Sequence, residues 1–257
     1  MHVDLYSTVT IEYLKAAAFF ILLLEFLYSF LKKDGIYSIV GTFNNILRGL
    51  GLLVITLWID DYYFGGIFVK YAQSSSFAVS VSIWPTILCF VVLDSFFYLA
   101  HMLKHHVGFL WALHAVHHND QNFNMSTYMR ASWVERVLIT SLPLLGVFFL
   151  GFNVWDIAFA SAASFVYQFF CHSQYIRFPK IFEYVFITPN LHRIHHDQQE
   201  KNQYANFGTV LSLWDRLFGT YIPAIETFTP GIKGYHQDDF IKMETDPIKE
   251  YLKSAYK

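Results

Sequence analysis

The sequence predicts an all-α integral membrane protein, with about four transmembrane helices and a cytosolic helical cap that carries the histidine boxes. Three observations lead to this fold class. Apolar residues make up 54% of the chain and charged residues only 15%, whereas a soluble domain usually carries about 25% charged residues. Four apolar stretches approach or exceed the roughly 20 residues that a helix needs to cross a bilayer. Histidines gather beside the ends of these stretches, twice in the pattern H-x-x-H-H.

The first two apolar stretches lie in the N-terminal part of the chain. Residues 16–31 follow Lys15, and no A-x-A cleavage pattern comes after them. We therefore expect a membrane anchor rather than a removable signal peptide. Residues 39–59 contain Arg48, whose charge must reach the membrane interface or find a partner within the protein.

The third apolar stretch covers residues 79–100, and a fourth region covers residues 137–170. The fourth region is too long for one span and is interrupted near the sequence G-F-N-V-W-D, so we expect two shorter helices folded as a hairpin. The chain is then one membrane domain, 1–257, in four parts: the first three transmembrane helices in 1–100, a first cytosolic histidine segment in 101–136, the transmembrane hairpin in 137–171, and a second cytosolic histidine segment with the tail in 172–257. The tail from residue 228 is polar and is expected to be a surface helix or a loose end.

The basic residues predict the orientation of these spans. An even number of crossings separates the main basic positions, so they all fall on one side, which the positive-inside rule makes cytoplasmic. These positions are Lys32, Lys33, Lys104, Arg130, Arg136, Arg177, Lys180, Arg193, Lys201 and Arg216. Asp60, Asp61 and Lys70 fall on the opposite side. The clustered histidines share the basic side, so we expect a multi-pass protein of a bacterial inner membrane or the ER with its histidines in the cytoplasm.

Nine histidines are expected to converge at this membrane edge. Residues at i, i+3 and i+4 of a helix share one face, and each H-x-x-H-H triple and the pair in H-M-L-K-H have this spacing. The nine are His101, His105, His114, His117, His118, His172, His192, His195 and His196. Neutral imidazole is the commonest protein ligand for a metal ion, and nine ligands suit two ions, each with four or five nitrogens and an open position. His106 is turned about 100° away from His105, and whether it is a ligand stays open.

The ligand types leave several metals open. Imidazole suits zinc, copper, iron and nickel. The H-E-x-x-H motif of zinc proteases is absent, and so is the Glu-x-x-His pairing of di-iron carboxylate bundles. A redox centre that binds dioxygen beside a lipid layer accounts for nine histidines better than a zinc hydrolase does, although zinc can replace iron during purification.

Three motifs resemble those of the fatty acid hydroxylase / sterol desaturase superfamily of integral-membrane di-iron enzymes. They are D-S-F-F-Y-L-A-H-M-L-K-H, L-W-A-L-H-A-V-H-H-N-D-Q-N-F-N-M-S-T-Y-M-R-A-S, and T-P-N-L-H-R-I-H-H followed by F-G-T-V-L-S-L-W-D-R-L-F-G-T-Y. The similarity covers roughly residues 88–221 and looks closest to the alkylglycerol monooxygenase-like branch. That branch usually has a glutamate directly after the first motif, where this chain has His106.

The resemblance implies an O2-dependent oxidoreductase that hydroxylates or desaturates an aliphatic C–H bond of a lipid. It implies two iron ions held by the nine histidines, and a lipid substrate taken from the membrane. No haem or flavin domain is expected in the remaining length, so electrons would come from an external electron-transfer protein or reductase, or from a pterin as in the alkylglycerol branch. Which lipid is the substrate, and which of the two reactions occurs, stay open.

Several other polar residues carry expectations. Asp94 lies seven residues before His101, which is two helical turns, so its carboxylate could bind that imidazole; it could equally be a helix-end residue satisfied elsewhere. Asn124 and Arg130 could orient ligands or a lipid head group, but loop-capping roles are favoured. Asp215 and Arg216 are expected to form a structural ion pair or cap.

Two other classes of protein would also combine apolar helices with histidines: a metal transporter and a structural metal-binding membrane protein. Transporters place ligands near the bilayer midplane on broken helices with acidic partners, and here mid-span acids are few, Glu25 being the clearest. A structural site would need a closed coordination shell. A net charge of -2 and the lack of a basic aromatic stretch argue against nucleic-acid binding. Cys89 and Cys171 lie in apolar runs, where a disulfide is not expected.

Overall fold

The computed structural model describes residues 2–59, 83–225, 227–233 and 239–255. Asp60, Asp61, Lys70 and the first residues of the predicted third span, 79–82, lie outside the described residues. The described part is all-helical, as predicted, with two isolated β-bridges, Phe186 to Leu211 and Asp197 to Pro230. The helices are α1 (His2–Lys32), α2 (Ile39–Ile59), α4 (Ile83–His106), α5 (Gly108–His118), η2 (Met125–Met129), α6 (Trp133–Glu135), the π-helix η3 (Arg136–Thr140), α7 (Leu142–Phe149), α8 (Val154–Cys171), η4 (Lys180–Tyr184), α9 (Pro189–His195), α10 (Glu200–Gln203), α11 (Leu213–Phe218) and α12 (Phe240–Ala255).

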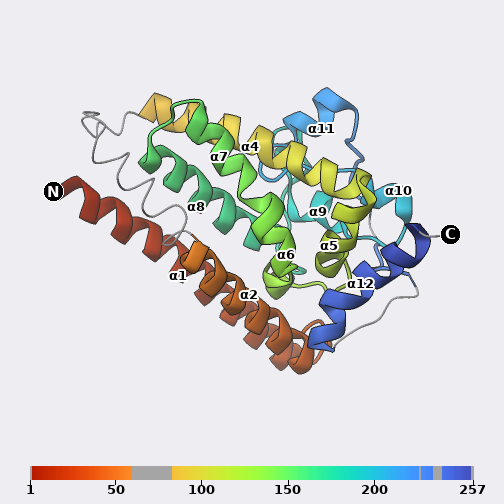
Figure 1. Cartoon of the computed structure of the whole chain (residues 1–257). Coiled ribbons are helices and arrows are strands. Elements are labelled where there is room, and N and C mark those ends of the chain that lie inside the picture. The colour runs from red at the N-terminus through yellow and green to blue at the C-terminus, as the bar shows by residue number, and fades with distance from the viewer. Residues whose placement is uncertain (1, 60–82, 226, 234–238, 256–257) are drawn as a thin grey trace.

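Helix α8 packs between α4 and α1, and α7 packs on α4 (Figure 1). The short helices α5, α9, α10 and α12 gather at the end of the molecule where α4 and α8 finish. Small and apolar side chains hold the long helices together. One buried group joins α4, α7 and α8: Cys89, Leu93, Val147, Ile157 and Ala160. Another joins α1, η2 and α8: Ala18, Leu22, Met125, Met129 and Phe169.

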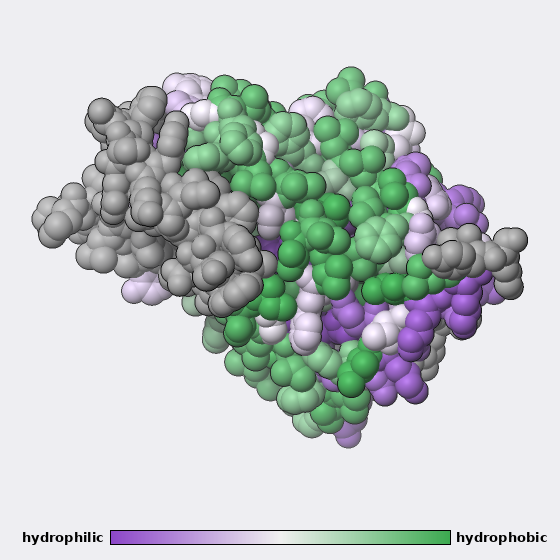
Figure 2. All heavy atoms as spheres, in the orientation of Figure 1, coloured by the Kyte–Doolittle hydropathy of each residue, from purple (hydrophilic) through white to green (hydrophobic). Residues whose placement is uncertain are grey.

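Two of the described helices, α4 and α8, are long and apolar enough to cross a membrane. Large apolar side chains also point outward from the described parts of α1 and α2, for example Phe20, which is 59% exposed, and Val54, which is 65% exposed. Figure 2 shows much of the surface over these elements and over α4 and α7 in green. Contiguous apolar surfaces of this kind mark faces that another protein or a membrane covers.

The structure differs from the predicted segments at two places. Helix α4 does not end at residue 100: it continues to His106, so His101 and His105 lie on the last turns of the helix itself. The predicted hairpin does turn at the interruption, where Gly151 has a φ of +87° and Asn153 caps α8. Its first arm is broken into a π-turn and the eight residues of α7, because Pro143 cannot donate a backbone hydrogen bond inside a continuous helix.

The C-terminal tail is a helix that covers the histidine region. Helix α12 packs on α5, and the Tyr251 ring approaches the Gly108 backbone so closely that a Cβ on Gly108 would lie 2.9 Å from that ring. Arg48 of α2 is buried and has partners within the protein, as expected. Its guanidinium lies 2.8 Å from the Glu244 carboxylate and donates to the Phe240 carbonyl at 2.6 Å. This ion pair ties α12 to α2.

We predict that Glu244→Ala releases α12. The substitution leaves the Arg48 charge buried without its carboxylate, and breaking such a pair costs about 3 kcal/mol or more. Faster proteolysis between residues 240 and 255 and a lower unfolding temperature in detergent are the expected readouts.

Glu250→Ala is the matched control on the same helix, because Glu250 pairs with Lys253 on the exposed face. It should leave both readouts near those of the parent protein. Equal effects of the two variants would show that the Arg48–Glu244 pair does not hold the helix.

Candidate metal centre

All nine histidines singled out in the sequence converge on one place. His101 and His105 come from α4, His114, His117 and His118 from α5, His172 from the residue that ends α8, and His192, His195 and His196 from α9 and its C-cap. Their side chains are buried or largely buried. Segments up to 95 residues apart in sequence therefore contribute rings to one interior region.

The nine rings form two groups in which the candidate ligand atoms lie within 4.8 Å of one another. Five rings make the first group: His101, His105, His114, His118 and His195. Four make the second: His117, His172, His192 and His196. The groups adjoin, since the rings of His118 and His196 are stacked with centroids 4.3 Å apart.

Helical spacing explains how each triple is divided. Residues four apart lie on one face, and the pairs His114/His118 and His192/His196 each stay within one group. The remaining member of each triple, His117 or His195, is turned about 100° from its neighbour and joins the other group. Each H-x-x-H-H triple therefore serves both groups rather than one.

Backbone carbonyls fix the orientation of four rings through Nδ1. These contacts are His101 to Phe207 at 2.9 Å, His117 to Arg130 at 3.1 Å, His172 to Gln168 at 2.7 Å and His195 to Ala205 at 2.7 Å. A carbonyl oxygen only accepts a hydrogen bond, so Nδ1 carries the hydrogen. In the neutral ring Nε2 then presents a lone pair to the centre.

The lone pairs of these rings face one another. The Nε2 atoms of His117 and His172 lie 3.2 Å apart, and those of His101 and His195 lie 3.0 Å apart. Two lone pairs at this distance repel, and protonation is not an easy remedy, because burial lowers the pKa of His117, His172 and His195 to about 3. A cation shared by the rings removes the repulsion.

Further ring nitrogens have no hydrogen-bond partner among the described residues. They are both nitrogens of His105 and His118, Nε2 of His114 and His196, and Nδ1 of His192. Unpaired polar atoms in a buried site carry a substantial free-energy cost. The donor set is therefore suited to binding metal ions, with four or five imidazole nitrogens in each group.

One acidic residue of the site escaped the sequence analysis. The Glu135 carboxylate lies 3.2 Å from Nδ1 of His114 and 2.8 Å from Nζ of Lys104. The carboxylate orients His114 as the backbone carbonyls orient four other rings, and Lys104 balances the charge of the carboxylate. Its signal in the sequence is S-x-x-E, which is typical of a helix cap, and Ser132 does cap α6 by accepting from the Glu135 amide.

The expected contact between Asp94 and His101 is not made. Asp94 accepts hydrogen bonds from the amides of Val210 and Leu211 and from the Trp214 indole. Two helical turns separate the pair by roughly 10 Å along the axis, which a carboxylate cannot bridge. Asp94 holds the 210–214 segment instead.

Asp215 acts closer to the histidines. Its carboxylate accepts from the amides of Phe207 and Gly208 at 2.7 and 2.8 Å, and the Phe207 carbonyl is the one that orients His101. The expected structural role is confirmed, but the Asp215 carboxylate binds backbone amides rather than forming an ion pair with Arg216. Burial is the main cause that raises the pKa of Asp215 to about 6.

Arg130 and Asn124 have the capping roles that the sequence favoured. Arg130 is fully buried and donates to the carbonyls of Val116 and Asn119 at the end of α5. Asn124 caps η2 with a reciprocal capping box that involves Thr127. Arg130 thus also stabilises the last turn of the helix that carries three of the histidines.

His106 stands outside both groups. Its side chain is exposed, Nδ1 contacts the Met102 carbonyl of the same helix at 2.8 Å, and its ring lies 5.2 Å from that of Tyr204. The neighbouring His105 points into the first group, so consecutive residues of α4 face opposite environments.

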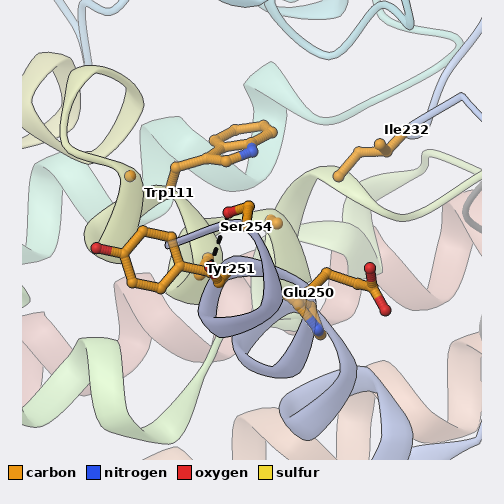
Figure 3. Close-up of a pocket in the computed structure, with 9 residues that line it drawn as sticks. Trp111, Ile232, Glu250, Tyr251 and Ser254 are labelled. Carbon is orange, nitrogen blue, oxygen red and sulfur yellow. Dashed lines mark hydrogen bonds between the residues drawn. The ribbon is translucent and has the colours of Figure 1, made fainter. Parts of the chain in front are cut away.

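Two cavities lie beside Trp111, and one of them reaches the centre. One of about 430 Å³ reaches His105 and is lined otherwise by Trp111, Gln198, Glu200, Gln203, Tyr204, Ile232 and Lys233. The other, of about 470 Å³, lies between α5 and α12, with Trp111 and Ile232 on its wall as well (Figure 3). The Trp111 side chain therefore separates a polar approach to the centre from an apolar groove under α12.

The sequence model of the fatty acid hydroxylase family matches residues 86–220, just over half of the chain. Alkylglycerol monooxygenase of Xenopus tropicalis is 29% identical over 158 residues, 58% of this chain and 33% of the relative. The human alkylglycerol monooxygenase is 30% identical over 147 residues, 54% of this chain and 31% of the relative. Ornithine lipid hydroxylase OlsE of Rhizobium tropici is 24% identical over 270 residues, 96% of this chain and 77% of the relative.

The chain thus spans about a third of the length of the alkylglycerol monooxygenases that it matches. No solved structure matches it.

We predict that His105→Ala lowers the bound metal per chain, whereas His106→Ala does not. The two residues are adjacent on α4, but only His105 lies within a group of converging rings. Metal content measured by mass spectrometry on protein purified in detergent tests this. An equal loss in both variants would place His106 among the ligands.

We predict that Glu135→Ala weakens metal binding about tenfold or more, because His114 loses the carboxylate that orients it. Glu135→Gln keeps an acceptor oxygen for the same Nδ1 and should retain most of the affinity. Competition with a chromophoric chelator measures both. Parent-like affinity in Glu135→Ala would remove this residue from the site.

Proposed function

The chain belongs to the fatty acid hydroxylase family, and on this premise we propose that it is an O2-dependent membrane oxidoreductase that hydroxylates an aliphatic C–H bond of a lipid. We further propose a non-haem centre of two iron ions held by the nine converging histidines. The observation that carries the proposal is the pair of adjoining imidazole groups whose lone pairs face a common interior.

The donor set supports two redox-active ions. Five nitrogens in one group and four in the other are fewer than the six ligands that iron commonly takes, so each bound ion would be able to bind a small molecule as well. Iron bound there would supply the electrons that activate dioxygen for attack on an unactivated C–H bond. A structural metal site would fill its coordination shell with protein atoms.

The chain's own residues orient the ligands and keep water out. Carbonyls at Arg130, Gln168, Ala205 and Phe207 hold four rings in the tautomer that a metal needs. Phe123 packs against the rings of His172 and His196. Such an apolar lining excludes water from a reactive centre.

The two reactants would reach the centre from different directions. The exposed apolar helices support lateral entry of a lipid from the bilayer. Electrons would come from a separate electron-transfer protein or reductase, or from a pterin, and the polar cavity that reaches His105 is the aqueous approach for such a donor.

The proposed membrane placement has α1, α2, α4 and the 137–171 hairpin embedded, with the histidines at the cytoplasmic face. Basic residues on that side agree with the positive-inside rule. The exposed apolar side chains of α1, α2 and α4 support the burial of these helices in lipid.

The names of the relatives narrow the substrate class. One group is described as monooxygenases of alkylglycerols and another as a hydroxylase of ornithine lipids. Both names denote insertion of oxygen into a polar lipid, so we favour hydroxylation over desaturation, and a lipid with a polar headgroup as the substrate.

We expect about two irons per chain when the protein is purified anaerobically in detergent. His117→Ala and His195→Ala remove one ligand from each group, so each should lose metal and abolish O2 uptake with lipid and a chemical reductant. One ion per chain, or parent-like turnover in both variants, would argue for a transport or structural metal site instead.

We expect the lipids of a deletion strain to lack a species that returns on complementation with the parent gene but not with His195→Ala. A hydroxylated product is heavier than its precursor by one oxygen atom, whereas a desaturated product is lighter by two hydrogens. Mass spectrometry therefore separates the two reactions and identifies the lipid.

A further inference from the structure

Two short helices of the second histidine segment form one continuous surface, which we call the η4–α11 collar (residues 180–185 and 213–218). The Ser212 amide donates to the Val185 carbonyl at 2.9 Å, and the Ser212 hydroxyl donates to the Glu183 carbonyl at 2.8 Å. Arg216 also donates to the Glu183 carbonyl, at 2.9 Å. These bonds make the two segments a single unit.

The outer face of the collar is apolar. Six large side chains on it are at least half exposed: Ile181, Tyr184, Val185, Leu213, Leu217 and Phe218. An apolar surface of this kind is uncommon on a face that water covers. These residues lie in the segment that the sequence predicts to be a cytosolic cap, and a cap surrounded by water does not account for their exposure.

The charges of the collar are sorted by sign. Its acidic residues, Glu183 and Asp215, are buried, whereas Lys180 and Arg216 are exposed. Arg177, just before the collar, is exposed as well. An apolar face edged by cations is suited to the boundary between acyl chains and phosphate headgroups.

The collar packs against the middle of α4 and not beyond its end. The Trp214 indole donates to Asp94 at 2.9 Å, and the Phe218 ring stacks on Tyr98 at 5.4 Å between centroids. Exposed apolar side chains of α4 continue past this level to Leu103, which is 48% exposed. With a rise of 1.5 Å per residue, Leu103 lies roughly 7 to 14 Å further along the helix.

The collar therefore lies alongside the apolar band of α4 rather than above it. Figure 2 agrees: the surface over α11 is green, like that over α4, whereas the surface toward α10 and the end of α12 is purple. The apolar faces of α4 and of the collar are continuous on one side of the molecule.

We propose that the η4–α11 collar is inserted into the bilayer, with its apolar face among the upper acyl chains and its exposed cations at the headgroups. The second histidine segment is thus seated in the membrane surface. This inference rests on the proposed membrane placement and not on the proposed reaction. Since α9 follows η4 directly, insertion would hold the His192–His196 segment at the level where a lipid chain enters.

Single cysteines report the position of the collar. The native Cys89 and Cys171 are fully buried, so a thiol-reactive fluorophore should label an added cysteine preferentially. Leu217→Cys and Ile181→Cys probe the collar, Leu88→Cys on exposed α4 is the lipid-facing reference, and Lys201→Cys on α10 is the water-facing control. The labelled full chain is placed in nanodiscs of lipids brominated near the headgroup end of the acyl chain.

We expect brominated lipid to quench the labels at Leu217 and Ile181 about as strongly as at Leu88, and several-fold more than at Lys201. Aqueous iodide should give the reverse order. Iodide quenching of the collar labels equal to that at Lys201 would overturn the proposal. So would protection from both quenchers together with disulfide crosslinking between Leu217→Cys chains, which would assign the face to a second copy. Because no step depends on turnover, the outcome is independent of the reaction assigned to the histidines.

Discussion

Mutual repulsion among buried imidazole lone pairs is the constraint on which the rest of this structure depends. Nine rings occupy one interior region, and at least four present Nε2 without a hydrogen toward another ring. Burial that lowers the pKa of His117, His172 and His195 to about 3 keeps these rings neutral. Cations between the rings would make this arrangement favourable, which would link metal binding to the stability of the histidine region.

The surrounding polar groups are arranged to orient the rings with little net charge. Backbone carbonyls do most of this, and each is held by a buried side chain or a helix end: Asp215 fixes the backbone at Phe207, and Arg130 closes the last turn of α5. Among the hydrogen bonds of the nine histidines in the described part of the chain, the Glu135 carboxylate supplies the acidic contact, to His114, and Lys104 neutralises it. Neutral ligands would leave the positive charge of bound ions largely uncompensated, which would favour the binding of electron-rich small molecules there.

The position of this centre at the edge of the apolar helices separates two kinds of access. On one side lie exposed apolar faces of α4 and the η4–α11 collar; on the other lies a polar cavity that ends at His105. Under the proposed function, a lipid would approach the centre along the apolar faces, and a water-soluble electron donor would approach it through the polar cavity. Helix α12 packs on α5 at this polar side, and the Arg48–Glu244 pair connects α12 to α2.

The sequence by itself determined the helical class, the nine converging histidines and the family, because helical spacing and composition are local properties. Helical spacing placed the three histidines of each triple on one face of a helix. Only the tertiary structure decided how each triple is shared between two groups, which carbonyl orients each ring, and that Asp94 holds the 210–214 segment while Glu135 contacts His114. Those contacts join segments that are distant in sequence. Whether a side chain can reach its partner there depends on how whole helices are placed relative to one another. A local sequence pattern does not encode that placement.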